Sequence, residues 1–101
     1  MVIVEFTVVP LGEKSLSRYV AEIVKLLERR RIKYQLTPMS TVMETPSLKE
    51  AFEVVAEAHE LMFKLGAKRV STTVRIDDRR DREVHMEDKV KSVMEKVGDR
   101  L

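Results

Sequence analysis

The sequence of 101 residues contains no cysteine and no asparagine, and a single glutamine, Gln35. The lack of cysteine excludes disulfide bonds and thiolate metal sites. Glycine and proline each occur only three times, so no glycine-rich or proline-rich linker divides the chain. Few thermally labile amides combined with many Lys, Arg and Glu residues predict a thermophilic source.

The chain also lacks a large excess of charge and a long apolar run. Its 19 basic and 17 acidic residues leave a net charge of +2, and this near balance argues against a nucleic-acid partner. No apolar segment is long enough to span a membrane. The first ten residues carry Glu5 and have no basic start, so they do not resemble a signal peptide. We therefore expect a soluble cytoplasmic protein with no membrane partner.

The length predicts one domain over residues 1–101. A domain of this size has a thin core, so a sizeable ligand would bind on an open sheet face or between subunits. Residues 2–9 alternate as a strand whose apolar set should face the helices: Val2, Val4, Phe6 and Val8. A helix is expected from Ser15 or Ser17, either one serving as N-cap, to Arg31.

The rest of the chain predicts a hairpin, a helix, a strand and a final helix. Residues 32–37 and 40–45 are two short strands whose connection allows only antiparallel pairing. Ser47 and Glu50 have capping-box spacing before a helix that ends at Gly66. Its predicted apolar stripe comprises Leu48, Ala51, Phe52, Val55, Ala58, Met62 and Phe63. A strand over residues 67–77, a charged loop and a helix over residues 86–97 follow, the helix with Val90, Val93, Met94 and Val97 on one side.

This order predicts an α+β fold, a ferredoxin-like βαββαβ sandwich with an additional C-terminal helix. The outward set of the first and fourth strands is polar: Glu5, Thr7, Ser71, Thr73 and Arg75. The hairpin adds some of Gln35, Thr37, Thr41 and Glu44, although its register is not fixed by sequence. Such a surface suits a polar ligand, and equally a solvated or subunit-packed face.

Catalytic and metal-binding patterns are not visible. His59 and His85 have no second ligand at metal-binding spacing, so we expect no metal site, and His59 is predicted to be packed and hydrogen-bonded. No nucleophile motif, cofactor motif or phosphate loop is present. RNA recognition on this topology needs exposed aromatic residues on the central strands, and Phe6 belongs to the buried set.

Several segments together resemble the thiamine-binding protein family over nearly the whole chain. The most specific is the hairpin segment over residues 34–44, YQLTPMSTVME. Weaker matches are PLG at residues 10–12, SRYV at 17–20, AHE at 58–60, GAKRV at 66–70 and IDDR at 76–79.

The resemblance implies a ferredoxin-like fold, subunits paired through their sheets into homodimers or homotetramers, and binding of thiamine or its hydroxymethylpyrimidine part. The residues that it places at the site, which would lie at a subunit interface, are Thr37, Met39, Ser40, Thr41 and Glu44, with Thr7 and Ser71 less secure. The leading interpretation is a non-enzymatic ligand-binding protein with no cofactor. The alternatives are a regulatory or scaffold oligomerisation module with no thiamine role, and an enzyme that uses Glu44 or His59 as a base.

Overall fold

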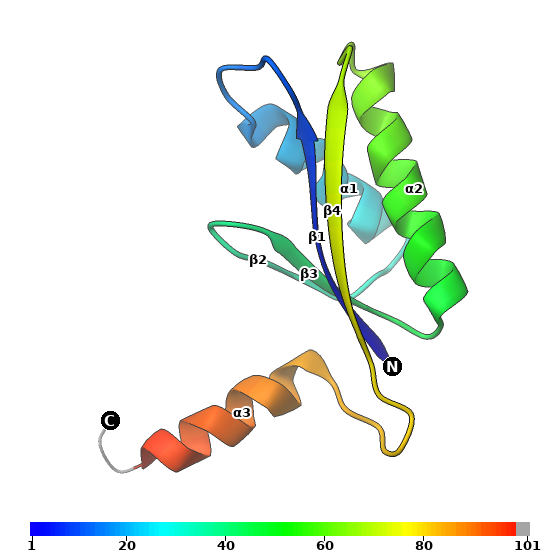
Figure 1. Cartoon of the computed structure of the whole chain (residues 1–101). Coiled ribbons are helices and arrows are strands. Elements are labelled where there is room, and N and C mark those ends of the chain that lie inside the picture. Colours follow the sequence, from blue (N-terminus) through cyan, green and yellow to red (C-terminus); the bar gives the residue numbers. More distant parts are fainter. Residues whose placement is uncertain (99–101) are drawn as a thin grey trace.

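The structure, a computed structural model, describes residues 1–98 and confirms the predicted order of elements. The predicted domain end at residue 101 lies outside the described residues. The elements, labelled in Figure 1, are β1 (Val2–Pro10), α1 (Ser17–Arg29), β2 (Tyr34–Leu36), β3 (Thr41–Thr45), α2 (Leu48–Lys64), β4 (Val70–Asp78) and α3 (Met86–Val97).

The four strands form one antiparallel sheet in the order β2-β3-β1-β4. Two helices cross over between its strands, which is the ferredoxin-like arrangement. β1 lies in the centre, where Phe6 is opposite Thr41 of β3 and Val74 of β4. The hairpin register, which the sequence alone did not fix, pairs Gln35 with Val42.

One face of the sheet packs against α1 and α2 and forms the core. The inward set of β1 is buried as predicted, with exposed fractions of 5% or less. The helices contribute the rest of the buried core, chiefly Tyr19, Ile23, Leu26, Leu27, Ala51, Val54, Val55, Ala58 and Met62. The periodicity of the apolar residues therefore determines which face of the sheet is covered.

The two ends of α1 differ from the prediction. The residue before its first turn is Leu16, and its side chain forms no capping hydrogen bond. The expected N-cap serines instead contact each other, with their Oγ atoms 3.3 Å apart. The helix ends at Arg29 rather than Arg31, because Arg31 adopts a φ of 56° and the Ile32 amide donates to the Leu27 carbonyl at 2.9 Å. This Schellman-type turn brings the Ile32 side chain into the core.

The start of α2 is as predicted, since the Ser47 side chain accepts a hydrogen bond from the Glu50 amide at 3.1 Å. Its buried stripe is different. Val54 is fully buried, whereas Phe52 and Phe63 are 52% and 40% exposed. The buried stripe runs at steps of three and four residues from Ala51 to Met62, and those two aromatic residues lie outside it.

Gly66, predicted as the end of α2, has a φ of 105° that favours glycine. The next amide, that of Ala67, turns back to the Met62 carbonyl at 3.0 Å. Because residues 65–67 complete this turn, β4 begins at Val70 and not at residue 67. The hairpin strands are also shorter than predicted, since Thr37 and Ser40 belong to the connecting turn.

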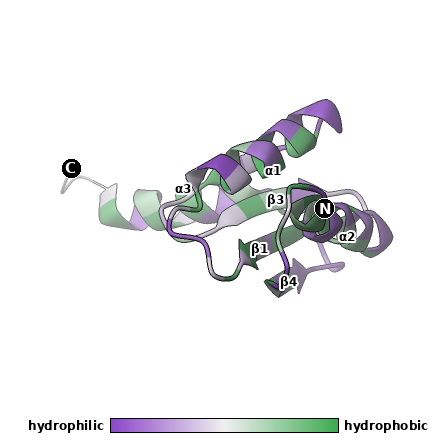
Figure 2. Ribbon diagram, turned by 90° about the horizontal axis from the view of Figure 1, so that it is seen from above, coloured by the Kyte–Doolittle hydropathy of each residue, from purple (hydrophilic) through white to green (hydrophobic). Residues whose placement is uncertain are grey.

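α3 has the predicted bounds and projects away from the rest of the domain in both views (Figures 1 and 2). Of the twelve residues in this helix, Met86 alone is buried. The apolar residues predicted on one side, Val90, Val93 and Met94, are 55%, 59% and 45% exposed. The apolar side of α3 is therefore not covered by residues 1–98.

Candidate functional site

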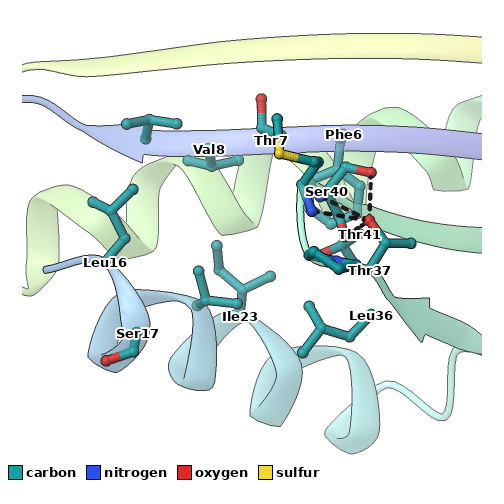
Figure 3. Close-up of a pocket in the computed structure, with 14 residues that line it drawn as sticks. Phe6, Thr7, Val8, Leu16, Ser17, Ile23, Leu36, Thr37, Ser40 and Thr41 are labelled. Carbon is teal, nitrogen blue, oxygen red and sulfur yellow. Dashed lines mark hydrogen bonds between the residues drawn. The ribbon is translucent and has the colours of Figure 1, made fainter.

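A hollow of about 310 Å³ lies between α1, the second half of β1 and the turn of the β2–β3 hairpin (Figure 3). That volume is at the small end of ligand sites. The lining residues are Phe6, Thr7, Val8, Val9, Leu16, Ser17, Val20, Ile23, Leu36, Thr37, Pro38, Met39, Ser40 and Thr41. Apolar side chains form the walls, and the hydroxyl groups are concentrated at the turn.

Thr37 holds the turn in shape. Its Oγ1 accepts hydrogen bonds from the amides of Met39 at 3.2 Å and Ser40 at 2.9 Å, and donates to the Ser40 carbonyl at 3.0 Å. The Thr37 amide also donates to that carbonyl at 2.9 Å. A threonine hydroxyl that binds its own turn in this way replaces a backbone partner. The side chain of Thr37 therefore positions Met39 and Ser40 over the hollow.

The Thr37→Ala substitution is expected to lower the free energy of unfolding by about 1–2 kcal/mol. It removes three hydrogen bonds at a half-buried site, each worth roughly 0.5–1.5 kcal/mol, and the turn relaxes in part. Urea denaturation measures this difference. Thr37→Ser keeps the hydroxyl and should retain most of the stability, so equal losses in both variants would contradict the role given to Oγ1.

Ser40 connects the hollow to the other face of the sheet. Its Oγ donates to Oε2 of Glu5 at 2.9 Å and lies 3.2 Å from Oγ1 of Thr37. Ser40 and Met39 also line a shallow depression of about 190 Å³ on the outer face, together with Glu5, Phe6, Thr7, Thr73 and Arg75. The two recesses are therefore separated only by the turn and the middle of β1.

Thr41 faces the helix side of the sheet, because it is opposite the buried Phe6. Its side chain lines the hollow and the residue is only 5% exposed. Its hydroxyl forms no hydrogen bond with residues 1–98. Every fully buried side-chain oxygen in those residues does have a partner, so the Thr41 hydroxyl is not fully buried. The Thr41 hydroxyl is therefore reached from the hollow, where it offers one donor and two acceptor positions.

The structure brings together five of the seven predicted site residues: Thr7, Thr37, Met39, Ser40 and Thr41. Ser71 is opposite Val9 on β4 and does not line the hollow. Glu44 is on the outer side of β3, opposite Ile3, and also lies apart from it. That Ser71 and Glu44 contact a ligand stays a prediction.

Glu44 is buried at the start of α3, with its side chain only 2% exposed. One carboxylate oxygen accepts a hydrogen bond from the Met86 amide, and the other is 3.1 Å from Nδ1 of His85. Lys33 Nζ lies 3.9 Å from the same carboxylate. The hydrogen bond to Glu44 raises the pKa of His85 above its ordinary value. Glu44 thereby fastens the N-terminus of α3 to the sheet, as an anion does at a helix start.

Sequence reasoning missed the helix wall of the hollow. Leu16, just before α1, and Val20 and Ile23 within it are apolar residues at helical spacing, which predicts burial alone, and no motif distinguishes a residue that lines a recess from one in the core. The prediction for His59 is confirmed, since its Nδ1 lies 2.6 Å from Oγ1 of Thr72 and its ring contacts Phe63.

Within the described part of the chain, no group of three or more His, Asp or Glu side chains is placed to hold a metal ion. None of the helices in residues 1–98 is both long and apolar enough to cross a bilayer. A cytoplasmic location stays a prediction.

The fold and the hollow define a small ferredoxin-like domain with a recess suited to a compact, partly apolar ligand. The model of the family described as thiamine-binding protein matches residues 4–94, and the chain belongs to that family. A UPF0045 protein of Methanothermobacter thermautotrophicus is 44% identical over 99 residues, which cover 96% of this chain and all of that protein. A UPF0045 protein of Staphylococcus xylosus is 49% identical over 105 residues, 98% of this chain and 97% of that one.

Solved structures agree with the fold. A hypothetical protein of Methanocaldococcus jannaschii superposes with a TM-score of 0.83 at 32% identity, covering 93% of this chain and 96% of that one. A Thermotoga maritima protein named as a candidate thiamine biosynthesis or salvage protein has a TM-score of 0.78 at 24% identity, covering 91% and 97%. At that identity the second likeness supports the fold alone.

Proposed function

We propose that the protein binds thiamine or its hydroxymethylpyrimidine part in the hollow between α1 and the hairpin turn, without catalysing a reaction. The observation that carries the proposal is the hydroxyl of Thr41, which has no hydrogen-bond partner among residues 1–98 and lies in an otherwise largely apolar recess. Membership of the thiamine-binding protein family supports the choice of ligand.

The chemistry of the ligand suits the two recesses. A pyrimidine ring is flat, with apolar faces for Phe6 and Leu36 and polar edges for the hydroxyls of the turn. The thiazolium ring of thiamine is a cation, and the carboxylate of Glu5 lies on the far side of the turn in the outer depression. A ligand that passes the turn would place its positive charge beside that carboxylate.

Calorimetric titration with thiamine and with hydroxymethylpyrimidine tests the proposal. We expect heat of binding and a rise in melting temperature, because a ligand that binds only the folded state stabilises it. No heat and no thermal shift at millimolar concentrations of either compound would overturn the proposal.

The Thr41→Val variant localises the site. Valine keeps the shape of threonine and removes the hydroxyl, so affinity for hydroxymethylpyrimidine should fall by about 2- to 12-fold, the value of one hydrogen bond. Ser92→Ala is the control for the loss of a hydroxyl, since Ser92 is exposed on α3 and lines neither recess. Equal affinities of Thr41→Val and the wild type would place the ligand elsewhere.

We further propose that the chain forms homodimers or homotetramers and that self-association completes a site at a subunit interface. The observation in favour is the uncovered apolar side of α3, which a thin single domain leaves exposed. Contiguous apolar patches of this kind mark association sites. The same observation favours the second candidate function, a regulatory or scaffold module, which predicts association without thiamine binding.

Sedimentation velocity at about 10–100 µM protein tests the self-association. The double variant Val90→Asp and Val93→Asp should shift the protein toward the monomer, because buried charges oppose association. Ser92→Asp introduces one such charge, against two in the double variant, on the opposite side of α3 and should leave the assembly intact. A monomeric wild type would refute the proposal.

A further inference from the structure

We propose that Glu5 is a positioning residue that sets the ligand specificity of the hollow by fixing the hydroxyl of Ser40 as a hydrogen-bond acceptor. The inference rests on the proposed function and deepens it. A ligand would then be selected for a donor group, such as the exocyclic amino group of an aminopyrimidine, at the position next to Ser40.

The argument begins with the protons at the turn. A carboxylate only accepts hydrogen bonds, and a serine hydroxyl has one proton. The 2.9 Å contact between Ser40 Oγ and Glu5 Oε2 therefore uses the Ser40 proton. It follows that Thr37 Oγ1, which lies 3.2 Å from Ser40 Oγ, can only act as the donor in that contact.

The hydrogen bonds of Thr37 allow no other arrangement of the hydroxyl protons at the turn. Its single proton is directed between the Ser40 carbonyl at 3.0 Å and Ser40 Oγ, and its lone pairs accept from the amides of Met39 and Ser40. Neither Thr37 nor Glu5 can offer a proton to a ligand at this point. What Ser40 presents to the hollow is consequently a lone pair.

The position of Glu5 allows this role. Glu5 lies on the outer face of β1, and its cross-strand neighbour on β4 is Arg75. In the portion of the chain that the structure describes, no cation lies within ion-pair distance of Glu5, so Ser40 is the group that its carboxylate holds. Ser40 itself lines both recesses and carries the effect of the charge from the outer face into the hollow.

Thr41 cannot provide the same selectivity. Its hydroxyl has no partner among residues 1–98, so it rotates to donate or to accept as a ligand requires. A ligand in which an oxo group replaces the amino group would direct its oxygen at the Ser40 lone pair. Two acceptors then face each other, and a site built for a donor discriminates strongly against a ligand that lacks it.

The experiment compares thiamine with its analogue in which an oxo group replaces the amino group of the pyrimidine. The wild type should bind thiamine about 10-fold or more tightly than the analogue. In Glu5→Gln the side-chain amide can donate a hydrogen bond to Ser40 Oγ, which leaves the Ser40 hydroxyl proton free to be donated to a ligand. The ratio of the two affinities should therefore fall toward one. Both ligands carry the thiazolium cation, so its lost attraction to residue 5 cancels in the ratio.

Glu60→Gln is the control for charge. Glu60 is exposed on α2 and lines neither recess, so its affinity ratio should equal that of the wild type. An unchanged ratio in Glu5→Gln would overturn the inference and leave the proposed function standing. A wild type that binds neither compound would overturn both.

A test without ligand examines the contact itself. Melting temperatures of Glu5→Ala, Ser40→Ala and the double variant form a cycle in which each single change removes the contact, and residues in one hydrogen-bond network give non-additive changes. Additive changes would show that the Glu5–Ser40 hydrogen bond is not formed in solution, which would also overturn the inference.

Discussion

The Phe6→Ala variant is expected to lose about 3–5 kcal/mol of unfolding free energy, the usual result of truncating a buried phenylalanine. Phe6 is 2% exposed at the centre of the sheet, and it lies between the helix core and the hollow. Because domains are stable by only about 5–15 kcal/mol, this loss is a large part of the total. Urea denaturation at a fixed protein concentration measures it.

Phe52→Ala is the matched control. It removes the same side chain from α2, but Phe52 is half exposed, so its loss should be well below that of Phe6→Ala and near the roughly 0.5 kcal/mol of ordinary surface changes. Similar losses at the two positions would mean that Phe52 is covered in solution, as a subunit contact would make it.

The Phe6 variant also has a consequence for binding. Phe6 belongs to the core and also lines the hollow, so its removal joins the hollow to space in the core. Phe6→Leu retains most of the volume and should recover much of the stability. A loss of thiamine affinity in Phe6→Leu, without a loss of folding, would show that the ring itself contacts the ligand.

The pair of phenylalanines shows what periodicity predicts and what it does not. Alternation along β1 correctly predicted that Phe6 is buried, because the period of a strand assigns each residue to one of two faces. The residues at the border of an apolar helix stripe are not assigned to one face in this clear way. Phe52 was predicted in the apolar stripe next to Ala51, but tertiary packing favoured Val54.

The candidate site was predictable only in part, for a physical reason. The hairpin segment indicated the right turn, yet Thr41 and Glu44 belong to opposite faces of β3. They are three residues apart on one strand, so alternation alone separates them, but which of the two lies on the helix side depends on the hairpin register, which no local pattern encodes. The role of Glu44 depends in addition on α3, a segment that follows it by more than forty residues.

Removal of that carboxylate is the second large effect that we expect. Glu44→Ala leaves the Met86 amide without its acceptor and His85 without its anion. A hydrogen bond to a charged group contributes roughly 1.5–3 kcal/mol, so hydrogen exchange at the Met86 amide should accelerate by about 10-fold or more. Nuclear magnetic resonance of the labelled protein measures that exchange.

The pH dependence gives a second signature of the same contact. In the folded protein the pKa of His85 is raised above 6.5 by its hydrogen bond to Glu44. A group with a raised folded pKa stabilises fully below its unfolded pKa, and that stabilisation is lost as the pH rises through the folded pKa. The protection of the Met86 amide should therefore be greatest below about pH 6.5 and weaken as the pH rises through the raised folded pKa of His85.

Two variants separate this role from general effects of charge. In Glu44→Gln the shape is kept and the charge is lost, so the pKa of His85 should return toward its ordinary value and the pH dependence of the protection should flatten. Glu87→Gln removes an equal charge from the first turn of α3, but its partner Lys33 is exposed and the pair contributes little. If Glu44→Gln instead kept the pH dependence while thiamine affinity fell, Glu44 would contact the ligand, as the sequence resemblance implies, rather than hold the helix.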